Sequence, residues 1–115
     1  MGLAAAQPST STPTMPPVPL TLEAAVQAAL ADASRRTGSA VAALEVLSAA
    51  AVTWRDGSLG CSQPGMFYSQ ALVPGYRVRI RTAGQDFDYH AGLRGAVTLC
   101  PEGRAVDPLP DGSRQ

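Results

Sequence analysis

This chain of 115 residues has no lysine, one histidine, two cysteines and no long apolar run. Because nine basic residues balance nine acidic ones, we expect neither nucleic acid nor an anionic membrane surface as the main partner. No apolar run approaches the roughly 20 residues of a membrane-spanning helix. Two cysteines and one histidine without close spacing rarely complete a zinc site, and no phosphate-loop pattern is present, so we expect no cofactor.

Both ends of the chain are predicted to lie outside a single domain at residues 21–101. Residues 1–20 indicate a disordered linker or a signal-peptide remnant, because residues 3–6 resemble the end of a leader and a Pro/Ser/Thr-rich stretch follows. An ordinary alanine-rich terminus is the alternative. Residues 102–115 are polar and contain proline, which predicts a flexible tail.

The first regular element is predicted to be an amphipathic helix at residues 22–36. Thr21 is a suitable N-cap, apolar residues recur at helical spacing, and Gly38 can end the helix. Residues 41–54 favour a strand over a helix because the segment ends in β-forming residues, with residues 49–51 as a candidate bulge or break.

Two alternating segments predict a β-hairpin at residues 76–90. One register satisfies both faces: it places Ile80 opposite Phe87 and Val78 opposite Tyr89, and it sets Arg81, Arg79 and Arg77 against Asp86, Asp88 and His90. The charged face indicates a solvated ladder of ion pairs, with an anion site on the arginines as the alternative. Because alanine disfavours the positive φ of a tight turn, we expect a four-residue turn at residues 82–85.

A fourth strand is predicted before Pro101. Matching apolar faces sets Val97 opposite Tyr89 and Leu99 opposite Phe87, which puts Cys100 near Asp86. The fold class is therefore α+β, with one N-terminal helix packed on a four-stranded antiparallel sheet and a long Gly/Pro-rich loop between the first two strands. The polar face of the sheet is left for that loop or for water.

The two cysteines connect the long loop to the last strand. In an exported chain, Cys61 and Cys100 most simply form one disulfide, and closing a loop of about 40 residues contributes about 4 kcal/mol in the loop-entropy model. The alternative is two free thiols in a cytosolic protein. A catalytic set of Cys61, His90 and Asp88 can be drawn, but a disulfide would consume the nucleophile.

The candidate binding residues lie in and beside the long loop. Aromatic residues and methionine are enriched at interfaces, so the apolar character of this loop indicates a partner-binding surface, with a small core beneath the loop as the alternative. The candidates are Trp54, Asp56, Leu59, Gln63, Met66 and Tyr68.

Three motifs carry a resemblance to a family of small exported bacterial proteins without an assigned activity. They are Val52-Thr-Trp-Arg-Asp-Gly-Ser-Leu-Gly-Cys61, Gln63-Pro-Gly-Met66 and Pro74-Gly-Tyr-Arg77. The order of elements also resembles PepSY-type modules, although the long cysteine-containing loop departs from their pattern. That resemblance implies a secreted or membrane-attached module that restrains peptidases.

Together these features predict a non-enzymatic, secreted or periplasmic binding module that presents residues 55–75 to another protein, with a peptidase as the candidate partner. One alternative is a small cysteine-dependent enzyme or ligand-binding protein that uses Cys61 and His90, with a cytoplasmic location if the thiols are free. The other is a structural envelope protein.

Overall fold

The computed structural model describes residues 19–110. The predicted linker or leader at residues 1–20 therefore lies almost entirely outside the described residues. The described elements are α1 (Leu22–Thr37), the short 3-10 helix η1 (Val41–Ala43), β1 (Glu45–Trp54), β2 (Val73–Thr82), β3 (Gln85–Gly92) and β4 (Thr98–Cys100).

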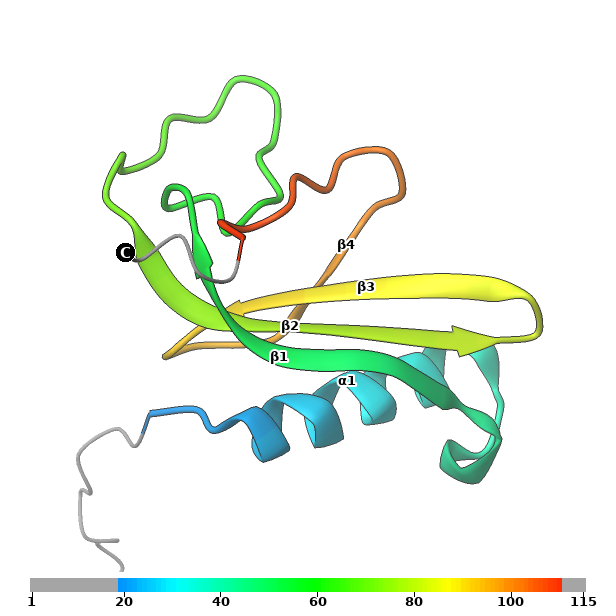
Figure 1. Cartoon of the computed structure of the whole chain (residues 1–115). Coiled ribbons are helices and arrows are strands. Elements are labelled where there is room, and N and C mark those ends of the chain that lie inside the picture. Colours follow the sequence, from blue (N-terminus) through cyan, green and yellow to red (C-terminus); the bar gives the residue numbers. More distant parts are fainter. Residues whose placement is uncertain (1–18, 111–115) are drawn as a thin grey trace, which may run out of the picture.

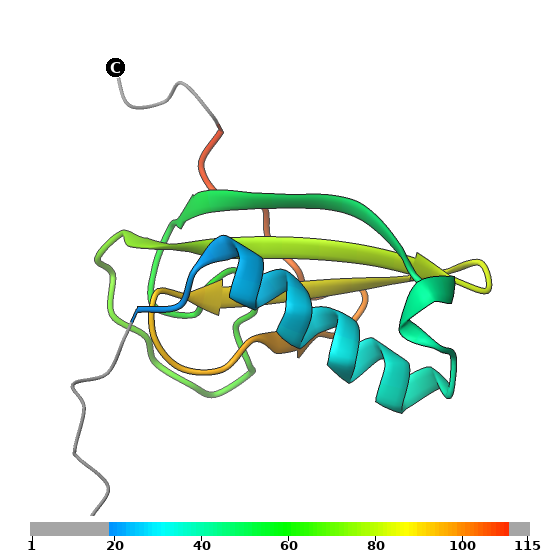
Figure 2. The same ribbon diagram turned by 90° about the horizontal axis from the view of Figure 1, so that it is seen from below.

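The four strands form one antiparallel sheet in the order β1-β2-β3-β4, and α1 runs beneath one face of it (Figure 1). Seen from below, α1 crosses the strands diagonally (Figure 2). This arrangement confirms the predicted α+β fold, including the long loop between β1 and β2. No helix within residues 19–110 is long and apolar enough to cross a membrane.

α1 begins and ends at its predicted capping residues. The Thr21 hydroxyl accepts a hydrogen bond from the Ala24 amide at 3.1 Å, and Gly38 adopts a φ of 76° and donates its N–H to the Ser34 carbonyl. The buried face of the helix consists of alanines, whose small side chains allow close packing on the sheet. This face packs on four apolar side chains of the hairpin, namely Val78, Ile80, Phe87 and Tyr89.

The predicted register between β2 and β3 is confirmed at every predicted pair. The predicted four-residue turn is wrong, because Thr82 pairs with Gln85 and only Ala83 and Gly84 connect the strands. Ala83 adopts a φ of 53° and Gly84 a φ of 77°. Two positive φ values match the right-handed twist of the flanking strands, and the pairing of a ten-residue strand outweighs the strain at one alanine.

Two other predictions about the sheet are corrected. The irregularity in β1 lies between Val46 and Ser48 rather than at residues 49–51, which pair regularly with β2. Leu99 lies opposite Tyr89, two residues from the predicted register, and Cys100 therefore lies opposite Asp88 instead of near Asp86. A shift of two residues keeps the same side chains on the same face, so the alternation of side chains could not exclude it.

Candidate functional site

Two segments cover one end of the sheet face opposite α1 (Figure 1). One is the β1–β2 loop, residues 55–72, and the other follows β4 at residues 101–110. The Val106 amide donates to the Gly60 carbonyl, and the Leu109 amide donates to the Thr53 carbonyl, both at 2.9 Å. Part of the segment that the sequence placed in a tail thus hydrogen-bonds to the loop and to β1.

Trp54 fixes the base of the β1–β2 loop. The side chain is completely buried, its indole Nε1 donates to the Ala91 carbonyl at 2.9 Å, and its ring stacks on His90 with centroids 4.4 Å apart. Gly60 and Gly75 make room for the indole, since an added Cβ would lie 2.6 Å and 2.9 Å from its atoms. Trp54 therefore packs in a small core under the loop, and its side chain has no exposed surface.

The predicted disulfide between Cys61 and Cys100 is present, with Cα atoms 5.8 Å apart and a sequence separation of 39. It ties the β1–β2 loop to β4. The described residues contain no free cysteine. Since the thiolate is the nucleophilic form of cysteine, the disulfide leaves Cys61 without the group that a cysteine-dependent mechanism needs.

Other candidate residues organise the backbone of the loop. The Asp56 carboxylate accepts hydrogen bonds from the Ser58 hydroxyl at 2.6 Å and amide at 2.8 Å, and these bonds lower the pKa of Asp56. The Tyr68 hydroxyl accepts a hydrogen bond from the backbone amide of Gln63 at 3.0 Å. Leu59 adopts a φ of 56°. The side chains that sequence reasoning assigned to a partner thus also hold the loop in one conformation.

Apolar side chains are exposed around the tip of the loop. Phe67 is 97% exposed, and Met66 and Leu72 are each 58% exposed. Met66 was among the sequence candidates, whereas Phe67 was not. The position of Phe67 two residues after the turn at Pro64 and Gly65 is the signal that could have identified it, because side chains beside an exposed turn are seldom buried.

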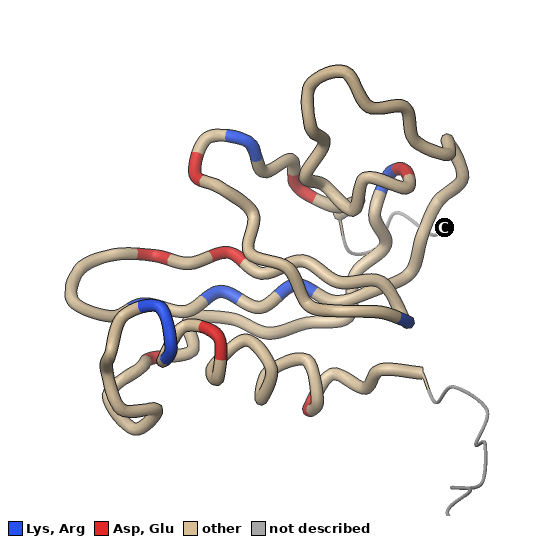
Figure 3. Tube along the Cα trace, turned by 180° about the vertical axis from the view of Figure 1, so that it is seen from behind, with Lys and Arg blue, Asp and Glu red and all other residues tan. Residues whose placement is uncertain are grey.

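Charged residues of β2 and β3 lie side by side along the two strands (Figure 3). They alternate with the apolar residues that pack on α1 and therefore belong to the opposite face of the sheet. Arg77 donates to the Asp88 carboxylate twice, at 2.9 Å and 2.7 Å, and to Asp107 at 2.9 Å. The His90 Nε2 atom lies 3.0 Å from Asp88 Oδ1, and Nδ1 lies 2.7 Å from the Leu59 carbonyl. The Asp88 side chain is only 19% exposed. Desolvation opposes ionisation, but the hydrogen bonds from Arg77 and the close approach of the His90 ring hold the pKa of Asp88 well below its usual range.

The sequence predicted a solvated ladder of ion pairs along this hairpin. The Arg81–Asp86 pair matches that description, with both side chains largely exposed. The Arg77–Asp88 pair does not, because the β1–β2 loop and the segment after β4 shield it from water. Sequence periodicity placed these residues on one face and left that face to the loop or to water, without deciding between the two.

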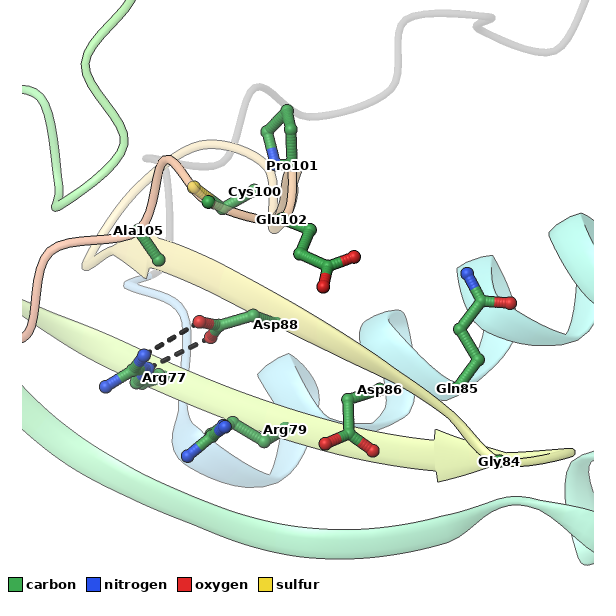
Figure 4. Close-up of a pocket in the computed structure, with 11 residues that line it drawn as sticks. Arg77, Arg79, Gly84, Gln85, Asp86, Asp88, Cys100, Pro101, Glu102 and Ala105 are labelled. Atoms are coloured by element: carbon green, nitrogen blue, oxygen red, sulfur yellow. Dashed lines mark hydrogen bonds and ion pairs between the residues drawn. The ribbon is translucent and has the colours of Figure 1, made fainter.

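A polar groove of about 500 Å³ lies beside this network, between the hairpin and residues 101–105 (Figure 4). Its lining includes Arg79, Asp86, Asp88 and Glu102, with Glu102 reaching in from the segment after β4. Within residues 19–110, no three His, Cys, Asp or Glu side chains are grouped so that they could hold a metal ion. Asp86 and Asp88 are already ion-paired with Arg81 and Arg77, so neither carboxylate of the hairpin is free for a ligand.

Comparison with known proteins gives a family and no activity. Residues 26–100 match the model of a domain of unknown function, DUF8738. No match to the chain was found among curated proteins or solved structures. The matched region contains most of α1, the whole sheet, the β1–β2 loop and both cysteines, which is more than half of the chain. The protein therefore belongs to the DUF8738 family.

Proposed function

We propose that this protein is a non-enzymatic, exported binding module that presents the β1–β2 loop to another protein. One observation carries the proposal: the base of the loop is fixed by the Cys61–Cys100 disulfide and the buried Trp54, while its tip exposes Phe67 and Met66. Exposed aromatic and methionine side chains are the kind of anchor that protein interfaces use.

Hydrogen bonds across the loop reduce the entropy that binding would otherwise cost. The Gly57 amide donates to the Ser69 carbonyl at 2.7 Å, which closes the loop near its base. Nearer the tip, the Gln63 amide donates to the Tyr68 hydroxyl. A loop that is ordered before it meets a partner retains more of its contact energy as affinity.

Export and the class of partner rest on two further arguments. Disulfides persist in oxidising compartments, so the bond between Cys61 and Cys100 supports a secreted or periplasmic location. The PepSY-like order of elements supports a peptidase as the protein that is bound and restrained. The exposed tip favours this function over a purely structural envelope protein, in which the loop would be packed down.

A peptidase panel tests the partner class. Purified representative serine, cysteine and metallopeptidases are incubated with the wild-type chain, and the rate of hydrolysis of a fluorogenic peptide is measured. We expect inhibition of at least one enzyme, and we expect Phe67→Ser to weaken it about tenfold or more, because an interface anchor contributes more than about 1 kcal/mol. The matched control is Val41→Ser, an exposed apolar residue in η1 at the far end of the sheet, which should inhibit as the wild type does. No inhibition in the panel would refute a peptidase partner.

Site-specific photocrosslinking tests the binding module independently of the partner class. A photoreactive amino acid is placed at position 67 or at position 41, and the chain is produced in its native host. A discrete crosslinked product at position 67 that is absent at position 41 is expected. If both positions give the same products, or if position 67 gives none, the loop does not present a binding surface.

A further inference from the structure

We infer that a second pocket, between the β1–β2 loop and β4, binds a small carboxylate ligand with an apolar body. The pocket has a volume of about 360 Å³, within the range of small-molecule sites. It lies beside the loop tip, but neither Met66 nor Phe67 lines it, so it adds a function to the proposed binding module. Its lining includes Leu59, Tyr68, His90, Leu99 and Arg104.

The charge of this pocket differs from that of the polar groove. Arg104 lines it, and no acidic side chain does among the residues that the structure describes. Within residues 19–110 the Arg104 guanidinium has no ion-pair partner, whereas Arg77 and Arg81 are each paired with aspartate. An unpaired guanidinium beside an apolar wall favours a carboxylate, because its planar fork can donate two parallel hydrogen bonds to one.

His90 closes the inner wall of the pocket. It is only 2% exposed, and its Nδ1 lies 2.7 Å from the Leu59 carbonyl, which can only accept, so Nδ1 carries a proton. Nε2 lies 3.0 Å from Asp88 Oδ1, yet in the described part of the chain no partner meets it with hydrogen-bond geometry. The hydrogen bond to the loop and the stacking on Trp54 hold the ring in place, so His90 forms a fixed side of the pocket.

Tyr68 supplies a further donor. Its hydroxyl oxygen accepts from the Gln63 amide, and its own O–H has no acceptor within residues 19–110. The remaining wall has apolar groups on both sides, Leu59 from the loop and Leu99 and Pro101 from β4, and it also includes the polar residues Ser58, Gln63 and Thr98. The disulfide between Cys61 and Cys100 joins the two sides and fixes the width of the pocket. A few donors in a mainly apolar cavity match a small anion that carries a hydrophobic group.

Benzoate is a suitable probe, with benzamide as its neutral isostere. The ¹⁵N-labelled full chain is titrated with each, and amide shifts are followed by NMR. We expect saturable shifts around Leu59, Tyr68 and Leu99 with benzoate, at a dissociation constant of about 1 mM, and binding of benzamide that is about tenfold weaker. Equal affinity for both probes, or no saturable shift at these residues, would overturn the inference.

Two arginine variants form the matched pair. Arg104→Gln is expected to weaken benzoate binding about tenfold, the effect of losing one charge-assisted hydrogen bond. Arg79→Gln is the control, because Arg79 also has no ion-pair partner in the described residues but lines the polar groove instead of this pocket. It should bind as the wild type does. An equal loss in both variants would show a non-specific charge effect and refute the assigned pocket.

A last arm separates two sources of the carboxylate. Tighter binding of N-acetylphenylalanine than of benzoate would assign the end of a peptide chain, and the reverse order would assign a free small carboxylate. Phe67→Ser should leave benzoate binding unchanged, so failure of the pocket and failure of the loop tip can be told apart.

Discussion

Replacing Gly75 with alanine is expected to displace Trp54 and open the base of the β1–β2 loop. An added Cβ on Gly75 would lie 2.9 Å from Trp54 Nε1 and 2.9 Å from the Cα atom of Gly92, and closer still to the Ala91 carbonyl oxygen. Carbon and oxygen atoms between strands normally keep about 3.3 Å or more. Two of these three neighbours are backbone atoms of β3, so β2 and β3 must move apart at this point.

The loss of stability in Gly75→Ala follows from atomic contacts alone. Gly75 does not have a positive φ, so alanine adds no backbone strain there. Overpacking in a rigid site and the loss of the Trp54–Ala91 hydrogen bond together predict a loss of about 4 kcal/mol. That is a large share of the roughly 5–15 kcal/mol by which a domain is stable. In Gly75→Ala the disulfide still links the loop to β4, but the indole of Trp54 no longer fills the base of the loop.

Gly92→Ala is the matched control, because Gly92 is the cross-strand partner of Gly75. An added Cβ on Gly92 would meet its nearest atoms at 3.9 Å, which is ordinary van der Waals contact, and we expect a change within about 0.5 kcal/mol. Urea unfolding followed by tryptophan fluorescence measures both, since Trp54 is the only tryptophan and is fully buried. If the two variants differ by less than about 1 kcal/mol, the packing of Trp54 over Gly75 does not hold the loop base.

Two further predictions concern the β2–β3 hairpin. Ala83→Asn should raise the free energy of unfolding by about 1 kcal/mol, because asparagine tolerates the positive φ at this turn and Asn-Gly is the favoured pair there; a thermal melt with an unchanged or lower Tm would contradict this. Desolvation raises the pKa of Asp88, but the hydrogen bonds from Arg77 and the nearby His90 ring lower the pKa by more than desolvation raises it. The ionised carboxylate therefore stabilises the fold above its unfolded pKa of about 4, and this contribution is lost as the pH falls toward the folded pKa. Asp88→Asn should therefore reduce stability at pH 7, and its urea midpoint should fall less steeply below about pH 5 than that of the wild type. The control Asp86→Asn, at a more exposed residue, should not flatten the fall in this way. Equal pH slopes of the urea midpoint in the wild type and Asp88→Asn would contradict the stabilising role of the Asp88 carboxylate.

The sequence by itself determined the elements whose signals are local or doubly constrained. Thr21 and Gly38 mark the ends of α1 because capping depends on only a few neighbouring residues. The register of the β2–β3 hairpin was predictable because a single alignment satisfies an apolar face and a charged face together. The disulfide followed from having only two cysteines in a chain expected to be exported.

Only the tertiary structure decided what each side of the sheet and the loop would meet. The register of β4 could not be predicted, because a shift of two residues leaves every side chain on the same face of the sheet. The alternation of apolar and polar residues therefore fits both registers. Trp54 looked like a surface anchor, yet it is buried because Gly60 and Gly75, distant in sequence, leave space for the indole. The same long-range packing turned His90 and Asp88 from exposed ladder residues into shielded ones and created the pocket beside Arg104. Burial of this kind depends on which segments cover a face, and local sequence patterns do not encode it.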